Sequence, residues 1–221
     1  MVQKILNSHK SVIFLNGDLP DVKEYYPYIN DKIIITADGA TTTLINNHIK
    51  VDYAIGDLDS IFSTKNSLIG QIIKIDDQTN TDFEKCMDFV LTNKLYPTLV
   101  FGISGGEIDH TINNIFSLSN HLLHNIFFLD IKKYGKKFGN LIINSDLILT
   151  LPIGSKVSLI PYPTALVTTN GLNWELDRQH LNNSNFISAR NHNISEKLYI
   201  KAEQGKLLVI TDYKGVKNYN A

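Results

Sequence analysis

Two aspartates in the segment Gly56-Asp57-Leu58-Asp59-Ser60 have the type and spacing of magnesium ligands. They follow a short apolar run typical of a buried strand, and Gly56 permits a tight turn there. Residues two positions apart can point the same way, so Asp57 and Asp59 could serve one ion. Mg²⁺ takes one or two carboxylates and fills its octahedron with water and phosphate. The alternative is an ordinary polar turn between a strand and a helix, since such turns are rich in Asp, Ser and Gly.

Three further polar clusters follow predicted strands: Asp38-Gly39, Asp76-Asp77-Gln78 leading to Asp82, and Gly105-Gly106 leading to Asp109-His110. The carboxyl ends of parallel strands converge on one crevice in a doubly wound sheet, so we expect all four clusters to meet there. Asp82 would join Asp57 and Asp59 around one Mg²⁺, or would only favour the start of a helix. Lys85, one turn further on, would meet phosphate or would be a solvated lysine. The two glycines would leave backbone N–H groups open to phosphate.

Carboxylates, a divalent cation and phosphate-binding backbone together suit phosphoryl or pyrophosphoryl transfer. One carboxylate could accept the proton of the attacking group. The sequence has no Walker motif, no strict dinucleotide fingerprint and no evident nucleophilic triad. Cys86 falls on the apolar face of a predicted helix and is expected in the core. His121 and His124 lack acidic partners and are not favoured as metal ligands.

Strands and helices alternate up to about residue 130, which predicts a parallel sheet with helices on both faces. The predicted strands are 11–16, 32–37, 53–56, 71–76, 98–103 and 125–129, and the predicted helices are 21–30, 41–48, 81–94 and 109–123. Helix 81–94 is the clearest, because Thr81 can cap it and its apolar residues recur at helical spacing. These elements would place the acidic clusters at one edge of the sheet.

Short strand-like runs replace this pattern in the second part of the chain: 140–143, 146–151, 156–160, 165–168, 185–189, 197–202 and 206–211. Turn residues separate them without a convincing helix, which predicts an antiparallel sandwich or barrel. We therefore expect two domains, residues 1–132 and 133–221, with the first carrying the acidic clusters.

Composition excludes several classes of function. The net charge is −1, which gives no long-range field for nucleic acid. The single cysteine excludes an internal disulfide and a multi-cysteine zinc site, and it fits a reducing compartment. We expect no transmembrane helix and no signal peptide, so the cytoplasm is the default location and no membrane partner is expected.

At this point the sequence resembles the thiamine pyrophosphokinase (thiamine diphosphokinase) family. The resemblance rests on the segments Ala37–Ala40, Gly56–Ser60, Asp77-Gln78 with Thr81–Cys86, Gly105–His110 with Asn113-Asn114, Asn170–Trp174 and Ile187–Asn191. It implies an α/β domain that binds nucleotide and Mg²⁺, followed by a β-sandwich that binds thiamine. It also implies Mg²⁺-dependent transfer of pyrophosphate from ATP to the thiamine hydroxyl, releasing AMP, in a homodimer with thiamine bound between subunits.

Carried over by match, Asp57, Asp59 and Asp82 would serve the metal and catalysis. The nucleotide and phosphate site would be lined by Asp38, Gly39, Gln78, Thr81, Lys85, Gly105, Gly106, Asp109 and His110. Trp174 would stack on thiamine, with Ser188 and Asn191 nearby, since a tryptophan face suits a flat or cationic ring. The alternative for Trp174 is an ordinary core tryptophan.

Two departures from the family pattern leave other functions open. Glu107 stands where many members carry Arg, and Arg190 stands where members often have a small or hydroxyl residue. A pyrophosphokinase acting on another hydroxymethyl heterocycle, such as a pterin, would share the metal and nucleotide motifs. A nucleotide-sensing module that has lost turnover is the non-enzymatic alternative.

Overall fold

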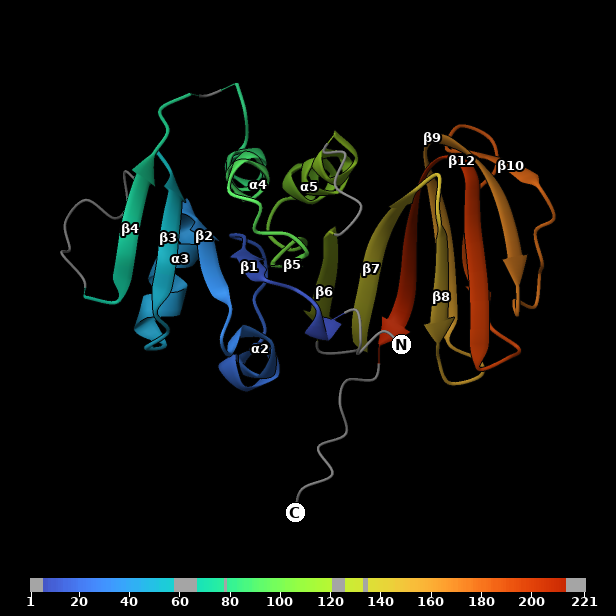
Figure 1. Ribbon diagram of the computed structural model, residues 1–221, viewed down its shortest axis with the longest axis horizontal. Coiled ribbons are helices and arrows are strands. Elements are labelled where there is room, and N and C mark those ends of the chain that lie inside the picture. Colours follow the sequence, from blue (N-terminus) through green and yellow to red (C-terminus); the bar gives the residue numbers. More distant parts are fainter. Residues whose placement is uncertain (1–5, 58–66, 78, 121–125, 133–134, 214–221) are drawn as a thin grey trace, which may run out of the picture. The chain divides into compact units, whose positions relative to one another are not determined.

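The computed structural model describes residues 6–57, 67–77, 79–120, 126–132 and 135–213 (Figure 1). The chain divides into two compact units. The parallel unit comprises residues 8–131, and the antiparallel unit comprises the chain from Lys132 onward together with the residues before Ser8. Each unit is described by itself.

The parallel unit is built on a sheet of the strands β1 (Ser11–Phe14), β2 (Ile33–Ala37), β3 (Val51–Gly56), β4 (Ile69–Lys74), β5 (Thr98–Phe101) and β6 (Ile126–Lys132). Their order is β4-β3-β2-β1-β5-β6, and all neighbouring pairs are parallel. The chain therefore moves outward from β1 to β4 and then returns to the other side of β1 with β5. Such a reversal between β1 and β5 is where open α/β sheets leave a crevice for ligands.

Four helices accompany this sheet in the described part of the unit: α2 (Val22–Ile29), α3 (Asp38–Asn46), α4 (Asp82–Thr92) and α5 (Ile108–Asn120). Helix α4 packs on β2 and β3 through an apolar face that includes Phe83, Met87 and Val90, and α5 lies beside it (Figure 1). Helix α3 begins at Asp38 and not at residue 41 as predicted, because a carboxylate is favoured in the first turn of a helix.

Apolar residues fill the centre of the parallel unit. All four residues of β1 and of β5 are buried, which explains why these strands read as continuous apolar runs. Phe14 of β1 stacks on Phe101 of β5 with ring centroids 5.3 Å apart, and Tyr25 of α2 meets Phe14 edge-on at 5.2 Å. This packing fixes the two strands between which the crevice opens.

The antiparallel unit contains the strands β7 (Gly135–Ile143), β8 (Asp146–Thr150), β9 (Lys156–Asn170), β10 (Gln179–Asn182), β11 (Ser188–His192) and β12 (Lys197–Tyr213). The first half of β12 pairs with β8 and with the second half of β9, which also pairs with β10. The second half of β12 pairs with β7 and with the first half of β9, which also pairs with β11. The long strands β9 and β12 thus run through both layers of a β-sandwich.

The predicted α/β fold with a following β-sandwich is confirmed, but four of the predicted short strands were wrong in extent. Runs 156–160 and 165–168 belong to the single strand β9, and runs 197–202 and 206–211 belong to β12. Pro161, Pro163 and Gly205 suggested breaks, yet the register shifts near Gly205 show that the strands bend there and continue. Strand β10 was not predicted. No helix among the described residues is long and apolar enough to cross a membrane.

Candidate active site

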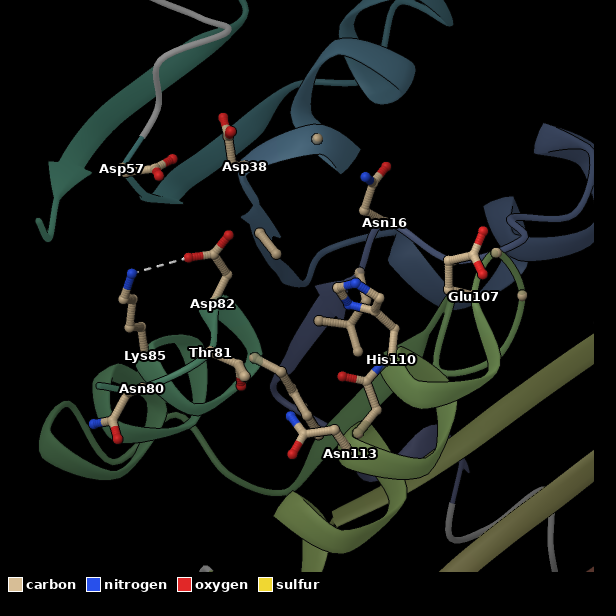
Figure 2. Close-up of a pocket in the computed structure, with 18 of the residues that line it drawn as sticks. Asn16, Asp38, Asp57, Asn80, Thr81, Asp82, Lys85, Glu107, His110 and Asn113 are labelled. Atoms are coloured by element: carbon tan, nitrogen blue, oxygen red, sulfur yellow. Dashed lines mark hydrogen bonds and ion pairs between the residues drawn. The ribbon is translucent and has the colours of Figure 1, made fainter. Parts of the chain in front are cut away.

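A cavity of about 760 Å³ opens at the carboxyl ends of the parallel strands (Figure 2). Its lining includes residues at or after the carboxyl ends of the strands β1 to β5. The first turns of α4 and α5 also contribute. The lining residues are 15–17, 37–39, 57, 79–83, 85, 105–107, 110, 113 and 114. Polar clusters far apart in the sequence therefore meet at one site, as the strand pattern predicted.

Asp38, Asp57 and Asp82 gather at one end of this cavity (Figure 2). Gly56 lies between two of them, because a Cβ built on it would be 3.0 Å from Asp38 Cβ and 3.4 Å from Asp82 Oδ1. Its φ of +151° is one that side chains rarely adopt. Glycine at this position lets the turn after β3 approach both aspartates.

Lys85 is the cation at this end of the cavity. Its side chain is 5% exposed, and its Nζ lies 3.1 Å from Asp82 Oδ1, one turn earlier on α4. A buried ammonium needs a charged or polar partner, and Asp82 supplies it. The structure therefore places Lys85 in the cavity and not on the solvated face of the helix.

The carboxylates at this end of the cavity could supply some, but not all, of the ligands of a hard divalent cation. Within the described ranges, no three His, Cys, Asp or Glu side chains come close enough to hold an ion by themselves. Mg²⁺ does not need such a cage, since it is usually held by one or two carboxylates with water and substrate phosphates. Asp57 and Asp82, which line a cavity large enough for a nucleotide's phosphates, fit that requirement.

The turn after β5 brings backbone to the opposite part of the cavity. Gly105 has a φ of +112°, and a Cβ on it would lie 2.3 Å from Asp18 Cγ. A Cβ on Gly106 would meet open space. The N–H of Gly105 donates to Thr111 Oγ1 at 3.2 Å, so this group is already bonded within the protein. Phosphate contacts from this turn would therefore come from Gly106 and the residues that follow.

The segment before α4 is shaped by Asp77. Its carboxylate accepts hydrogen bonds from the N–H and the hydroxyl of Thr79, at 2.8 and 2.7 Å. Both bonds lower the pKa of Asp77, and the bond from the backbone N–H has the larger effect. The turn presents Thr79 and Asn80 to the cavity, a role that the sequence prediction missed although an Asp two residues before a Thr is a turn signal.

Other lining residues were not predicted as site residues. Asn16 follows β1 and packs against Gly39, where a Cβ would lie 2.5 Å from Asn16 Cγ. Glu107 and Asn113 line the far part of the cavity, near His110 (Figure 2), and Asn114 also contributes to the lining. The prediction counted Asn16 as the last residue of strand 11–16, whereas β1 ends at Phe14, so Asn16 was not recognised as a polar residue beyond the strand end.

The remaining predicted residues of the parallel unit have different positions. Gly39, Thr81 and His110 line the cavity, as expected from their clusters. Asp109 is outside the lining, and its carboxylate accepts the N–H of His110 at 2.8 Å. The predicted residues Asp59 and Gln78 lie outside the described residues, as do His121 and His124.

Cys86 follows Lys85 on α4 and is fully buried, as predicted from its helical position. Burial raises the pKa of its thiol, and the nearby Asp82 carboxylate adds to the effect. A thiol of this kind stays protonated and is a poor nucleophile.

The predicted thiamine residues belong to the antiparallel unit, where Trp174 is 62% exposed and so is not a core tryptophan. The ring of His192 meets it edge-on, with centroids 5.5 Å apart. Asn191 is buried, and its side chain donates to Trp174 O at 2.8 Å and accepts from Trp174 N at 3.3 Å. Ser188 is buried at the start of β11.

Two family models match the chain in succession. The thiamin pyrophosphokinase catalytic domain matches residues 27–128, and the thiamin pyrophosphokinase vitamin B1 binding domain matches residues 143–207. The chain belongs to the thiamine pyrophosphokinase family. The two matches fall in the parallel and the antiparallel unit respectively.

Relatives carry the same family name. Thiamine pyrophosphokinase 3 of Oryza sativa subsp. japonica is 29% identical over 177 residues, which cover 66% of this chain and 60% of that protein. The match thus spans less than two thirds of that relative's length. Thiamine pyrophosphokinase 1 of Arabidopsis thaliana is 26% identical over 239 aligned residues, covering 91% of this chain and 85% of that protein.

Solved structures of the thiamine pyrophosphokinase family share the fold. The Bacillus subtilis protein superposes with a TM-score of 0.74 at 22% identity, covering 93% of this chain and all of that chain. The yeast protein superposes with a TM-score of 0.75 at 18% identity, covering 96% of this chain and 89% of that chain. At these identities the superpositions establish the α/β unit and the β-sandwich.

Proposed function

We propose that this protein is a thiamine diphosphokinase, which transfers pyrophosphate from ATP to the hydroxyl of thiamine and releases thiamine diphosphate and AMP. The observation that carries the proposal is the meeting of Asp57, Asp82 and Lys85 in one cavity at the strand ends of a family-matched catalytic unit. Opposite charges placed this way suit a polyphosphate bound with a metal ion.

Asp57 and Asp82, with Asp59, would hold Mg²⁺. When bound, Mg²⁺ would offset the negative charge of the phosphate oxygens. The chain's own carboxylates would orient the thiamine hydroxyl and accept its proton as the oxygen attacks the β-phosphorus of ATP. The bond to the α-phosphate breaks, and AMP leaves.

Lys85 supports this chemistry in two ways. Its ammonium holds Asp82 in place through the 3.1 Å contact, and it faces the cavity that would contain the phosphates. We expect the nucleotide to contact the wall made by Asp38, Gly39, Thr81, Gly105, Gly106 and His110. Gln78 and Asp109 are also assigned to the nucleotide site in this proposal. Glu107 also faces this cavity and repels phosphate, so the polyphosphate would lie toward Lys85.

Trp174 is proposed to stack on thiamine through its exposed indole. A thiazolium cation is attracted to the face of a tryptophan, and a flat aminopyrimidine also packs well on it. Asn191, whose amide is bonded to the backbone of Trp174, would act behind the indole, and Ser188 would lie beside it. The protein would work as a cytoplasmic homodimer with thiamine between subunits, and sedimentation velocity measures its mass directly.

Substrate choice tests the thiamine assignment. With ATP and Mg²⁺ present, AMP release should depend on added thiamine and not on a hydroxymethylpterin. Trp174→Ala should raise the KM for thiamine by about tenfold, the loss expected for an aromatic contact of 1–2 kcal/mol. AMP release driven by the pterin, and indifferent to Trp174→Ala, would support the other pyrophosphokinase. Binding of ATP without any turnover would support the nucleotide-sensing module.

A further inference from the structure

The carboxylate of Glu175 forms hydrogen bonds across the loop that carries Trp174 between β9 and β10. Glu175 Oε1 accepts hydrogen bonds from the N–H groups of Gly171 and Leu172, at 2.5 and 3.0 Å. Its Oε2 accepts the hydroxyl of Thr169 at 2.7 Å. We propose that Glu175 is a positioning residue that holds the Trp174 loop in the conformation that binds thiamine. The inference rests on the proposed function of Trp174.

The backbone of this loop needs an acceptor at that place. Gly171 has a φ of +106°, and a Cβ on it would lie 2.8 Å from Lys197 O, so the chain turns sharply against β12. The turn aims the N–H groups of Gly171 and Leu172 at one point. Consecutive backbone N–H groups of this kind form a concavity that binds an anion, and Glu175 supplies the anion from within the loop.

Thr169 and Leu176 close the base of the same loop. The N–H of Thr169 donates to Leu176 O at 2.8 Å, and the N–H of Leu176 donates to Thr169 Oγ1 at 2.8 Å. The hydroxyl of Thr169 therefore accepts from Leu176 and donates to Glu175, which fixes its orientation. Glu175 is thus joined both to the start of the loop and to its base.

Trp174 is held between these bonds and those of Asn191. Both backbone groups of Trp174 are bonded to the Asn191 side chain, while its indole is 62% exposed. An exposed aromatic ring on a fixed backbone binds a flat ligand with little loss of loop entropy. Without Glu175, the loop would have to be ordered at the moment of binding, and this cost would weaken binding of thiamine.

The chain offers a direct probe, because Trp174 is its single tryptophan. Time-resolved fluorescence anisotropy and acrylamide quenching, measured without ligand, report on the mobility and exposure of this side chain alone. Glu175→Ala should make the anisotropy decay faster and increase quenching. Glu175→Gln keeps an acceptor for the two N–H groups but loses the charge, so its anisotropy decay should lie between those of wild type and Glu175→Ala.

Glu203→Gln is the matched control. Like Glu175, Glu203 accepts a hydrogen bond from a threonine hydroxyl of β9, that of Thr168, at 2.6 Å. It also pairs with Arg178 at 2.5 Å, and both of these partners lie outside residues 169–176. This variant should keep the wild-type anisotropy. In turnover assays, Glu175→Ala should raise the KM for thiamine about tenfold with kcat changed less than about twofold, as expected when a charged hydrogen-bond acceptor that acts only on binding is lost.

Wild-type anisotropy and quenching in Glu175→Ala would overturn the proposal. If far-UV circular dichroism shows that Glu175→Ala does not fold, Glu175→Gln decides, and a decay equal to that of Glu203→Gln overturns the proposal. A faster decay in a protein that never converts thiamine supports the positioning of Trp174 and contradicts the proposed function, so the two failures are distinguishable.

Discussion

Asp82 and Lys85 are the residues on which the chemistry of the cavity most depends. The side chain of Lys85 is nearly buried and that of Asp82 is 35% exposed, so the pair lies where the cavity meets the protein interior. Removing one member of such a pair leaves the other charge poorly solvated. Asp82 therefore contributes in two ways, by balancing Lys85 and by facing the proposed metal and phosphates.

The first prediction is that Asp82→Asn lowers kcat about 100-fold or more, the loss typical when one electrostatic group of an active site is removed. The side chain keeps its size and can still accept a hydrogen bond from Lys85, so the fold should be retained. Asp88→Asn is the control, since Asp88 is exposed on the same helix and outside the cavity lining. Steady-state AMP formation measures both variants. An unchanged rate in Asp82→Asn would remove this residue from the chemistry.

Single residues show how far the sequence alone could predict the site. The aspartates were found because each follows a buried strand, and strand ends of a parallel sheet converge. Asn16 was missed because it was counted as the last residue of the predicted strand 11–16, although β1 ends at Phe14. The contact of Asn191 with the Trp174 backbone could not be predicted, because it joins β11 to a loop 17 positions away and leaves no periodic pattern.

At the scale of elements, helix α4 begins at a capping box that aims Asp82 at the cavity. Thr81 Oγ1 accepts the N–H of Glu84, and Glu84 Oε2 accepts the N–H of Thr81 at 2.9 Å. Glu84 also accepts a hydrogen bond from Ser117 of α5 at 3.2 Å. This bond therefore joins the first turn of α4 to the carboxyl-terminal half of α5.

The second prediction concerns this cap. Thr81→Ala should lower the free energy of unfolding by about 1 kcal/mol, the usual effect of losing a threonine cap. Thr81→Ser keeps the hydroxyl and should stay close to wild type. Urea unfolding followed by circular dichroism gives both values. Equal losses in Thr81→Ala and Thr81→Ser would show that the methyl group matters and that the cap does not.

The strands of the sandwich show where prediction from the sequence stops. Prolines and glycines marked the predicted ends of short strands, but β9 continues through Pro161 and Pro163, and β12 continues past Gly205. A residue that breaks an isolated strand is tolerated at a bulge or at an unpaired position of the ladder. Which of these applies depends on the neighbouring strand, and one sequence does not contain that information in a local pattern.

Asp212 joins three strands of the sandwich. From β12 its carboxylate accepts hydrogen bonds from Lys137 of β7 and, at 2.9 Å, from the N–H of Lys156 of β9. Burial by itself would raise the pKa of Asp212, but the bonds to Lys137 and Lys156 together lower it. The folded protein thus binds this proton less readily than the unfolded chain does.

The third prediction follows from that direction. The contribution of Asp212 to stability should be fully present above its unfolded pKa of about 4 and should be lost as the pH falls through its lower folded pKa. Asp212→Asn should cost about 1 kcal/mol near neutral pH, and the difference from wild type should shrink in acid. Urea unfolding of the wild type and of Asp212→Asn, at neutral and at acidic pH, measures this difference in the free energy of unfolding. A difference that grows as the pH falls would contradict the assignment.

At the scale of the whole molecule, two units with separate cores carry two parts of one proposed reaction. The parallel unit holds the cavity with Asp57, Asp82 and Lys85, and the antiparallel unit holds Trp174 on a fixed loop. The fold class followed from the change of periodicity near residue 131, because local hydrophobic patterns report the type of sheet. The identity of the substrate did not follow from periodicity, and the proposal of thiamine is based on membership of the family.

Product analysis tests the central claim most directly. The protein is incubated with Mg²⁺, thiamine and ATP labelled on its γ-phosphate, and the products are separated by chromatography. The account predicts AMP and labelled thiamine diphosphate in equal amounts, because attack at the β-phosphorus moves both outer phosphates together. Formation of ADP with a thiamine monophosphate, or no thiamine product at all, would contradict it.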